Sequence, residues 1–156
     1  IPMGFIGSDT ILTDLCHMVP NGTPYDFGIL ESRMHMVWMR TVCGRLESRY
    51  RYSRNLCYNT FPWPQVSEKQ REQIENLARN ILMIRESYPG TTLADLYDPD
   101  KMPSDLRKAH YELDVAVERL YRRKPFQSDE ERLSHLFRRY EKLVSHEDDS
   151  SLFNEE

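Results

Sequence analysis

The sequence predicts a mainly α-helical protein, in which a short β-containing N-terminal segment precedes a small antiparallel helical bundle. Three observations predict this class. Before residue 27 the apolar residues form short runs between turn-forming residues, a pattern typical of strands. After residue 27 they recur every three or four positions, as on one face of a helix. The predicted helices of the second half are joined by short connections, which favour antiparallel neighbours.

The N-terminal segment holds two apolar runs, Pro2–Ile6 and Thr10–Val19. Gly7-Ser8-Asp9 separates the runs, and Pro20-Asn21-Gly22 supplies a turn after the second. Two strands cannot bury a sheet by themselves. The segment is therefore predicted to be the end of a β-rich region whose other strands lie outside this sequence.

The pattern changes to a helical one at Phe27, after which an apolar residue recurs every fourth position: Leu30, Met34, Trp38 and Val42. This spacing predicts one helix whose apolar face belongs to a core, and Gly44 is predicted to end it. Further on, Phe61-Pro-Trp-Pro64 disfavours a helix and predicts an extended connector. Its aromatic rings could stack on a base, but an anchoring role is the preferred interpretation.

Three amphipathic helices are predicted in the second half. Ser67 with Gln70 forms a capping box for the first, Pro103 suits the first position of the second, and Ser128 with Glu131 caps the third. Pro89-Gly90 ends the first helix, and a short turn is predicted at Leu93–Tyr97. The apolar stripes are Ile74, Leu77, Ala78, Ile81, Leu82 and Tyr88; Leu106, Ala109, His110, Leu113, Val117 and Leu120; and Leu133, Leu136, Phe137, Tyr140 and Val144. The acidic residues 147–156 are predicted to form a disordered tail.

Basic charge is concentrated in one short segment, although the net charge of the sequence is −4. Residues 1–66 carry six arginines and five acidic residues, whereas residues 67–156 carry 15 basic and 20 acidic residues. Residues 40–54 alone hold five arginines and one glutamate, interleaved with Tyr50 and Tyr52. Attraction to phosphate follows the local field rather than the total charge, so this segment is a candidate nucleic-acid contact.

The three cysteines, Cys16, Cys43 and Cys57, are widely spaced and odd in number. This pattern argues against a disulfide framework and predicts free, mostly buried thiols in a reducing, cytoplasmic location. A metal site formed by Cys16, His17 and His35 is the less favoured alternative. No run of about 20 apolar residues predicts a membrane span.

Motifs of catalysis are missing from the sequence. It contains no Gly-x-Gly-x-x-Gly pattern, no P-loop and no acidic residue followed two positions later by lysine. Asn59-Thr-Phe-Pro62 resembles an amino-methyltransferase loop only superficially and is rejected as catalytic. His110 and Asp114 lie one helical turn apart and could form a base and its orienting partner, but buried hydrogen bonds between helices are the preferred interpretation.

Five distinctive motifs lie between residues 27 and 64: Phe27-Gly-Ile-Leu-x-Ser32, Met34-His-Met-x-Trp38, Val42-Cys-Gly-Arg-Leu46, Tyr50-Arg-Tyr-Ser53 and Tyr58-Asn-Thr-Phe-Pro-Trp-Pro64. Together they resemble the type IIL (MmeI-like) restriction–modification family. Downstream, Leu96-Tyr97, Met102-Pro103 and Ala109-His-x-x-Leu-Asp-x-Ala-Val117 resemble the helical domain of that family. The similarity extends over almost the whole sequence.

The resemblance implies a division into three parts. Residues 1–64 correspond to the end of a DNA target recognition domain, residues 65–146 to a C-terminal helical domain and residues 147–156 to the tail. It also implies a longer bacterial polypeptide with a nuclease and an adenine-N6 methyltransferase upstream. That polypeptide would need S-adenosylmethionine and Mg²⁺, whereas this fragment is expected to hold no cofactor and to be non-catalytic. The implied partner is double-stranded DNA.

The resemblance also gives the arginine segment specific roles. Glu47 and Arg49 are expected to read one base pair, since a carboxylate accepts from cytosine N4 and a guanidinium donates to guanine O6 and N7. Leu15 and Arg51 are candidates for a neighbouring position. The candidate phosphate contacts are Arg40, Arg45 and Arg54.

Two alternatives remain open. Glu47 and Arg49 could form only a surface ion pair, worth ~0–1 kcal/mol. The whole fragment could also be a structural or protein-interaction module that reads no bases. An independent small enzyme has little support from the residues.

Overall fold

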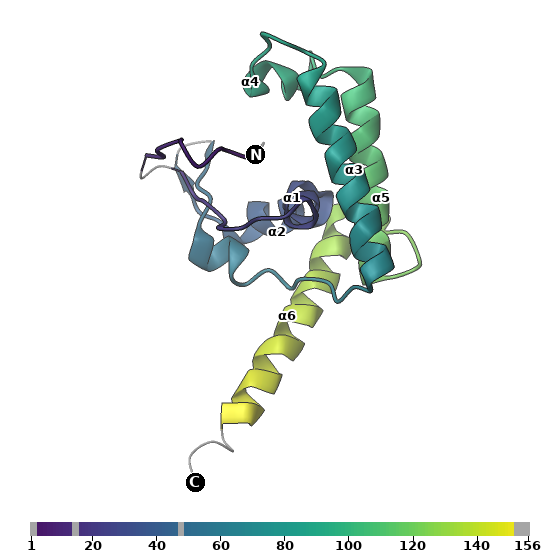
Figure 1. The fold of residues 1–156 in the computed structure, drawn as a ribbon. Coiled ribbons are helices and arrows are strands. Elements are labelled where there is room, and N and C mark those ends of the chain that lie inside the picture. Colours follow the sequence, from purple (N-terminus) through teal and green to yellow (C-terminus); the bar gives the residue numbers. More distant parts are fainter. Residues whose placement is uncertain (1–2, 14–15, 47–48, 152–156) are drawn as a thin grey trace. The chain divides into compact units, whose positions relative to one another are not determined.

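The computed structural model describes residues 3–13, 16–46 and 49–151, which form two compact units (Figure 1). The first unit consists of residues 1–36 and 65–125, and the second of residues 37–64 and 126–156. In chain order the elements are α1 (Pro24–Glu31), α2 (Arg33–Val42), β1 (Arg45–Leu46), β2 (Arg49–Tyr50), the π-helix η1 (Arg54–Tyr58), α3 (Glu68–Glu86), α4 (Leu93–Leu96), α5 (Ser104–Tyr121) and α6 (Asp129–Ser151).

The predicted β-containing N-terminal segment is wrong. Residues 3–13 and 16–23 contain neither a strand nor a helix. Strand pairing within the described residues is confined to β1 and β2, two residues each. The apolar side chains of the N-terminal segment include exposed ones, such as Ile11 and Met18. A short apolar run forms a strand only where a neighbouring strand pairs with its backbone groups, and the described residues supply none here.

The helix predicted from Phe27 to Gly44 is two helices. α1 begins earlier, at Pro24, because Thr23 and Asp26 form a capping box: the Thr23 amide donates to Asp26 Oδ2 at 2.8 Å and the Asp26 amide donates to Thr23 Oγ1 at 3.3 Å. Ser32 then adopts an extended conformation, and its hydroxyl donates to the carbonyl of Ile29 at 2.6 Å. This local hydrogen bond separates α1 from α2.

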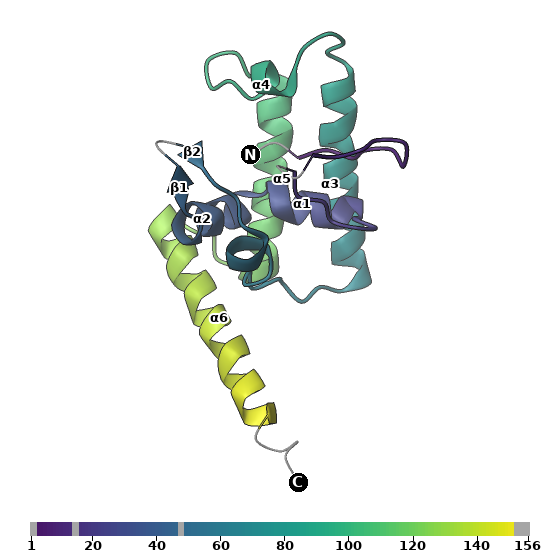
Figure 2. The same ribbon diagram turned by 90° about the vertical axis from the view of Figure 1, so that its left-hand side faces the viewer.

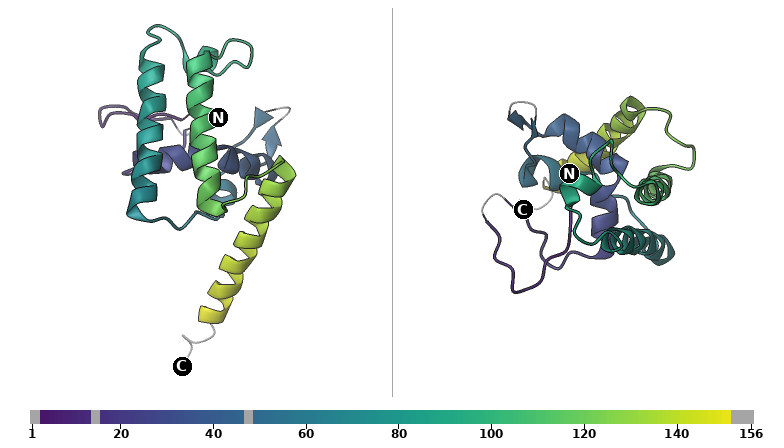
Figure 3. Two further views of the ribbon diagram at one scale, coloured as in Figure 1. Left: turned by 90° about the vertical axis from the view of Figure 1, so that its right-hand side faces the viewer. Right: turned by 90° about the horizontal axis from the view of Figure 1, so that it is seen from above.

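In the first unit, α1 packs against α3, and α3 packs against α5. Figures 2 and 3 show α3 and α5 side by side, with α4 near one end of the pair. The Ser67–Gln70 capping box of α3 is present as predicted. Pro103 is the residue before α5 rather than its first residue, a one-residue difference. The buried apolar side chains of this unit include Ile29, Ile74, Ile81, Leu106, Leu113 and Val117.

Gly28 sets the close approach of α1 to α3. A Cβ atom at this position would lie 2.7 Å from Ile74 Cγ2 and 3.5 Å from Ala78 Cβ. The side chain of Ile74 is fully buried and its β-branch is stiff, so it cannot move aside cheaply. The substitution Gly28→Ala is expected to lower the free energy of unfolding by about 1–3 kcal/mol, as overpacked cores do.

Gly44→Ala provides the matched control for this prediction. A Cβ atom at Gly44 would meet nothing within 4 Å, so we expect the stability to change by no more than ~0.5 kcal/mol. Urea unfolding of both variants is the measurement. Equal stability of the two variants would show that α1 and α3 are not in close contact at Gly28.

The third predicted helix, α6, does not belong to the same unit as α3 and α5. It groups instead with residues 37–64, where the ring of Trp38 lies 5.0 Å from that of Phe137 and 5.8 Å from that of Tyr140. The helix also continues to Ser151, past the start of the predicted tail at residue 147. Extending a helix that already exists costs far less than starting one. Residues 152–156 lie outside the described residues.

Within the first unit, a buried ion pair between α1 and α3 holds the N-terminal segment at Met3. Arg85 Nη2 lies 3.3 Å from Glu31 Oε1, and both side chains are at least nine-tenths buried. The Met3 backbone contacts both: its amide donates to Glu31, and its carbonyl accepts from Arg85 Nη1 at 2.6 Å. Arg85 Nε also donates to the Tyr97 hydroxyl at 2.7 Å. Burial acts to raise the pKa of Glu31, and the Arg85 guanidinium opposes that effect.

His110 and Asp114 each contact another residue by hydrogen bond. His110 Nε2 shares a hydrogen bond of 2.7 Å with the Tyr97 hydroxyl, and Asp114 Oδ1 accepts from the Arg33 amide at 2.7 Å. The second contact satisfies the first residue of α2. Burial, with the nearby Arg85, lowers the pKa of His110 to about 4. Both residues form hydrogen bonds to other elements, as the structural interpretation expected, but neither side chain is fully buried.

Candidate nucleic-acid interface

A short antiparallel hairpin follows the end of α2 in the second unit. Arg45 pairs with Tyr50, and Leu46 pairs with Arg49. The same register continues one step further, because the Arg51 amide donates to the Gly44 carbonyl at 2.9 Å. The hairpin therefore sits between the last turn of α2 and the π-helix η1. The basic segment found in the sequence is the segment that forms it.

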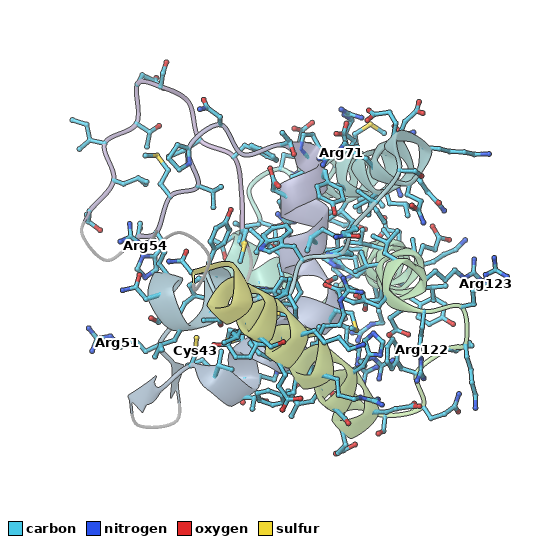
Figure 4. The ribbon with its side chains drawn as sticks, turned by 90° about the horizontal axis from the view of Figure 1, so that it is seen from below. Cys43, Arg51, Arg54, Arg71, Arg122 and Arg123 are labelled. Carbon is cyan, nitrogen blue, oxygen red and sulfur yellow. The ribbon has the colours of Figure 1, made fainter. Side chains whose placement is uncertain are left out.

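Three of the candidate DNA-contacting arginines have exposed side chains: Arg40 near the end of α2, Arg51 directly after β2 and Arg54 at the start of η1. Figure 4 shows Arg51 and Arg54 projecting outward from this part of the chain. Arg45 and Arg49 are the first residues of β1 and β2. Glu47 and Leu15 lie outside the described residues, so their predicted contacts stay predictions.

The π-helix η1 is held by its own polar residues. The Ser53 hydroxyl accepts from the Leu56 amide at 3.2 Å, the Cys57 amide donates to the Ser53 carbonyl at 2.8 Å, and the Asn59 amide donates to the Arg54 carbonyl at 2.9 Å. Single π-helical turns are often found at functional sites. No signal in the sequence predicted this turn, because the cap that forms it leads equally well into an α-helix.

The buried side chain of Trp38 anchors the hairpin and η1 within the second unit. Its side chain is 1% exposed, and its indole Nε1 donates to Thr60 Oγ1 at 3.3 Å. Thr60 in turn donates to the Leu56 carbonyl at 2.8 Å, which links Trp38 to η1. Phe61 is buried against Trp38 and lies 5.8 Å from the ring of Trp63. The aromatic connector thus packs within the second unit.

A hydrogen-bonded cluster beneath the hairpin was not predicted from the sequence. The Tyr52 hydroxyl donates to the thiol of Cys57, and the Cys57 thiol donates to Cys43. Cys43 and Cys57 are buried and free, as predicted, whereas Cys16 is exposed. Burial raises the pKa of Tyr52 and raises that of Cys57 to about 12, so both groups stay protonated at neutral pH. We call these three residues the Tyr52–Cys57–Cys43 cluster.

The described part of the chain shows neither a metal site nor a membrane span. No group of three or more His, Cys, Asp or Glu side chains lies close enough there to hold a metal ion. None of its helices is both long and apolar enough to cross a membrane.

Comparison with known proteins places this region in a family. The family model described as the target recognition domain of MmeI matches residues 1–65, and that of the MmeI C-terminal domain matches residues 66–146. DNA methyltransferase A of Bacillus subtilis (strain 168) is 50% identical over 144 residues, which cover 92% of this chain and 16% of that protein.

A solved structure, described as the type IIL restriction–modification enzyme MmeI in complex with DNA, is 52% identical with a TM-score of 0.78. The match covers 81% of this chain and 17% of that chain. The chain thus spans about one sixth of the length of these two relatives. With the family models matching residues 1–65 and 66–146, this chain belongs to the MmeI family.

Proposed function

We propose that this chain is the DNA sequence-recognition part of a larger methyltransferase. The observation that carries the proposal is the hairpin of the second unit, which is preceded in the chain by the exposed Arg40 and followed by the exposed Arg51 and Arg54, in a chain of the MmeI family. A two-stranded β-ribbon fits into the major groove of duplex DNA, where each base pair presents a distinct pattern of donors and acceptors. The relative solved in complex with DNA supports the choice of ligand.

Within this proposal, Glu47 and Arg49 read one C·G pair. Arg51 and Leu15 contribute to a neighbouring position. Arg40, Arg45 and Arg54 contact phosphates, which position the protein without specifying sequence. The exposure of Arg40 and Arg54 supports the phosphate role, since both can reach a ligand without any rearrangement of the core.

We assign the chemistry to other parts of the same polypeptide. Adenine-N6 methylation with S-adenosylmethionine, and DNA cleavage with Mg²⁺ by a fused nuclease, belong to the proposal because the chain resembles a family with these activities. The bacterial DNA methyltransferase among the relatives supports the methylation. Residues 1–64 act as the recognition domain and residues 65–146 as the helical domain in this scheme.

Salt dependence of DNA binding tests the proposal. Each arginine that neutralises a phosphate releases condensed counterions, so its loss makes the negative slope of log K against log salt shallower by about 1. We expect Arg54→Gln, made in the complete polypeptide, to show this loss. It should weaken binding to the specific site and to unrelated DNA alike, because phosphates carry no sequence.

Arg79→Gln is the matched control, since Arg79 is an exposed arginine that already pairs with Glu75 on α3 at 2.8 Å. The control is expected to leave the slope unchanged. If Arg54→Gln and Arg79→Gln behave identically, Arg54 does not contact phosphate. Binding that does not weaken with salt in any variant would instead favour a structural or protein-interaction module.

A further inference from the structure

We propose that the Tyr52–Cys57–Cys43 cluster is a specificity device: it fixes the register of the hairpin and so determines which strand face points toward DNA. This inference rests on the proposed function. It concerns positioning residues that flank the hairpin or lie in η1, and none of the three is expected to contact a base. The argument follows from the strand register, the hydrogen bonds of the cluster and the shortness of the hairpin.

Cys43 and Tyr52 are the residues just outside the paired part of the hairpin. Arg45 pairs with Tyr50, and the bond from the Arg51 amide to the Gly44 carbonyl continues the same alignment. The next positions outward from these pairs are 43 and 52. The thiol of Cys57, presented from η1, hydrogen bonds to both residues. The cluster therefore joins the two ends of the hairpin to a third element of the same unit.

Because residues alternate between the two faces of a strand, anchoring Tyr52 also sets the face of the residues next to it. Successive residues of a strand lie on opposite faces. Tyr52 is half-buried and turned toward Cys57, whereas the neighbouring Arg51 is exposed. Positions 49 and 51 both alternate with Tyr52 along the chain, and Arg49 and Arg51 are the two arginines proposed to read bases. A slip of one residue would exchange the two faces.

The hairpin needs such an anchor because it is very short. Each strand has two residues, and an isolated two-stranded hairpin is marginally stable at best in water. Cys57 is 0% exposed and sits in a turn held at both ends by backbone hydrogen bonds. A one-residue slip would break the hydrogen bond between the Tyr52 hydroxyl and the buried Cys57 thiol. The thiol would then lack this partner, and leaving a buried polar group unsatisfied costs free energy.

The test compares Tyr52→Phe and Cys57→Ala in the complete polypeptide. Tyr52→Phe removes one hydroxyl and keeps the ring. We expect the ratio of methylation at the specific site to methylation at sites with one altered base pair to fall about tenfold, or about 1.4 kcal/mol. The maximal rate on saturating specific DNA should stay within about twofold. Modified-base sequencing measures the ratio, and single-turnover kinetics measures the rate.

Two further variants separate register from packing. Cys57→Ser keeps a donor and an acceptor at position 57 and is expected to restore most of the ratio lost in Cys57→Ala. Tyr111→Phe, which removes an exposed tyrosine hydroxyl on α5, should leave the ratio unchanged. The Cys57→Ser and Cys57→Ala pair also gives the answer if Tyr52→Phe fails to fold.

The outcomes distinguish this inference from the proposed function. If Tyr52→Phe and Cys57→Ala show the same ratio of specific to altered-site methylation as Tyr111→Phe, the cluster is only a packing feature and the inference is wrong. The exchange of Glu47 and Arg49 is measured in parallel. A methylated motif that stays unchanged in that exchange, with activity retained, would refute the proposed base-reading role itself.

Discussion

Exchanging the signs of Glu47 and Arg49 is expected to move methylation by the complete polypeptide to a motif with one C·G pair reversed. In the proposed contact, the carboxylate at position 47 accepts from cytosine N4 and the guanidinium at position 49 donates to guanine O6 and N7. Glu47→Lys with Arg49→Asp places the donor and the acceptor in the opposite order. The double variant therefore matches the pair with guanine and cytosine interchanged.

The size of the change follows from two contacts. Each good base contact is worth ~1–3 kcal/mol of discrimination, so two contacts give a change of about 100-fold or more between the original and the reversed motif. The single variants should be poor on both motifs, because each leaves two like groups facing one base pair. Such non-additivity is expected for residues that act on one target.

Modified-base sequencing of treated DNA is the measurement. The pair Glu75 and Arg79 provides a matched control, because it is a surface ion pair on α3 with N···O at 2.8 Å. Glu75→Lys with Arg79→Asp makes the same exchange of charges and should leave the motif unchanged. If the exchange at positions 47 and 49 also leaves an active enzyme with its original motif, those two residues form only an ion pair, and the bases are read by residues elsewhere.

Removing the buried cation of the first unit is expected to cost about 3–5 kcal/mol of stability. Arg85→Met leaves the Glu31 carboxylate more than nine-tenths buried without its partner, and it also removes the donor to the Met3 carbonyl. Breaking one side of a buried ion pair is strongly destabilising for this reason. Urea unfolding of the chain measures the loss.

Two companion variants identify its cause. Arg79→Met, on the exposed side of the same helix, should change the stability by no more than ~0.5 kcal/mol. Adding Glu31→Leu to Arg85→Met removes the unpaired charge and should recover more than half of the loss. A loss below ~1 kcal/mol in Arg85→Met alone would contradict the buried pair.

Local features of the fold could be read from the sequence, and long-range ones could not. The Ser67–Gln70 capping box is found as predicted, because both residues and the backbone they satisfy lie within one turn of a helix. The Thr23–Asp26 capping box could also have been recognised. The four-residue apolar spacing, however, begins after Phe27, so the predicted helix started three residues later than α1 does. The strands of the N-terminal segment were wrong because an apolar run does not reveal whether it has a pairing partner.

The same limit applies to the candidate site. Five arginines in residues 40–54 predicted a basic surface, and the three whose side chains the structure describes, Arg40, Arg51 and Arg54, are exposed. The supporting contacts were invisible because their partners are distant in sequence: Trp38 packs against Phe137, and Met3 bonds to Arg85. No window of ten or twenty residues contains such a pair. Resemblance to a family supplied the roles of Glu47 and Arg49, which composition alone would have assigned to a surface ion pair.

The construction of the second unit from two stretches of chain limits how its specificity could be transplanted. A chimaera that exchanges only residues 1–64 would separate Trp38 from the Phe137 and Tyr140 rings with which it packs. The grafted Trp38 and hairpin would then have to pack against the corresponding helix of another protein. A graft of residues 37–64 together with 126–151 would keep these packing contacts. The useful cutting points therefore lie within α2 and in the loop before α6.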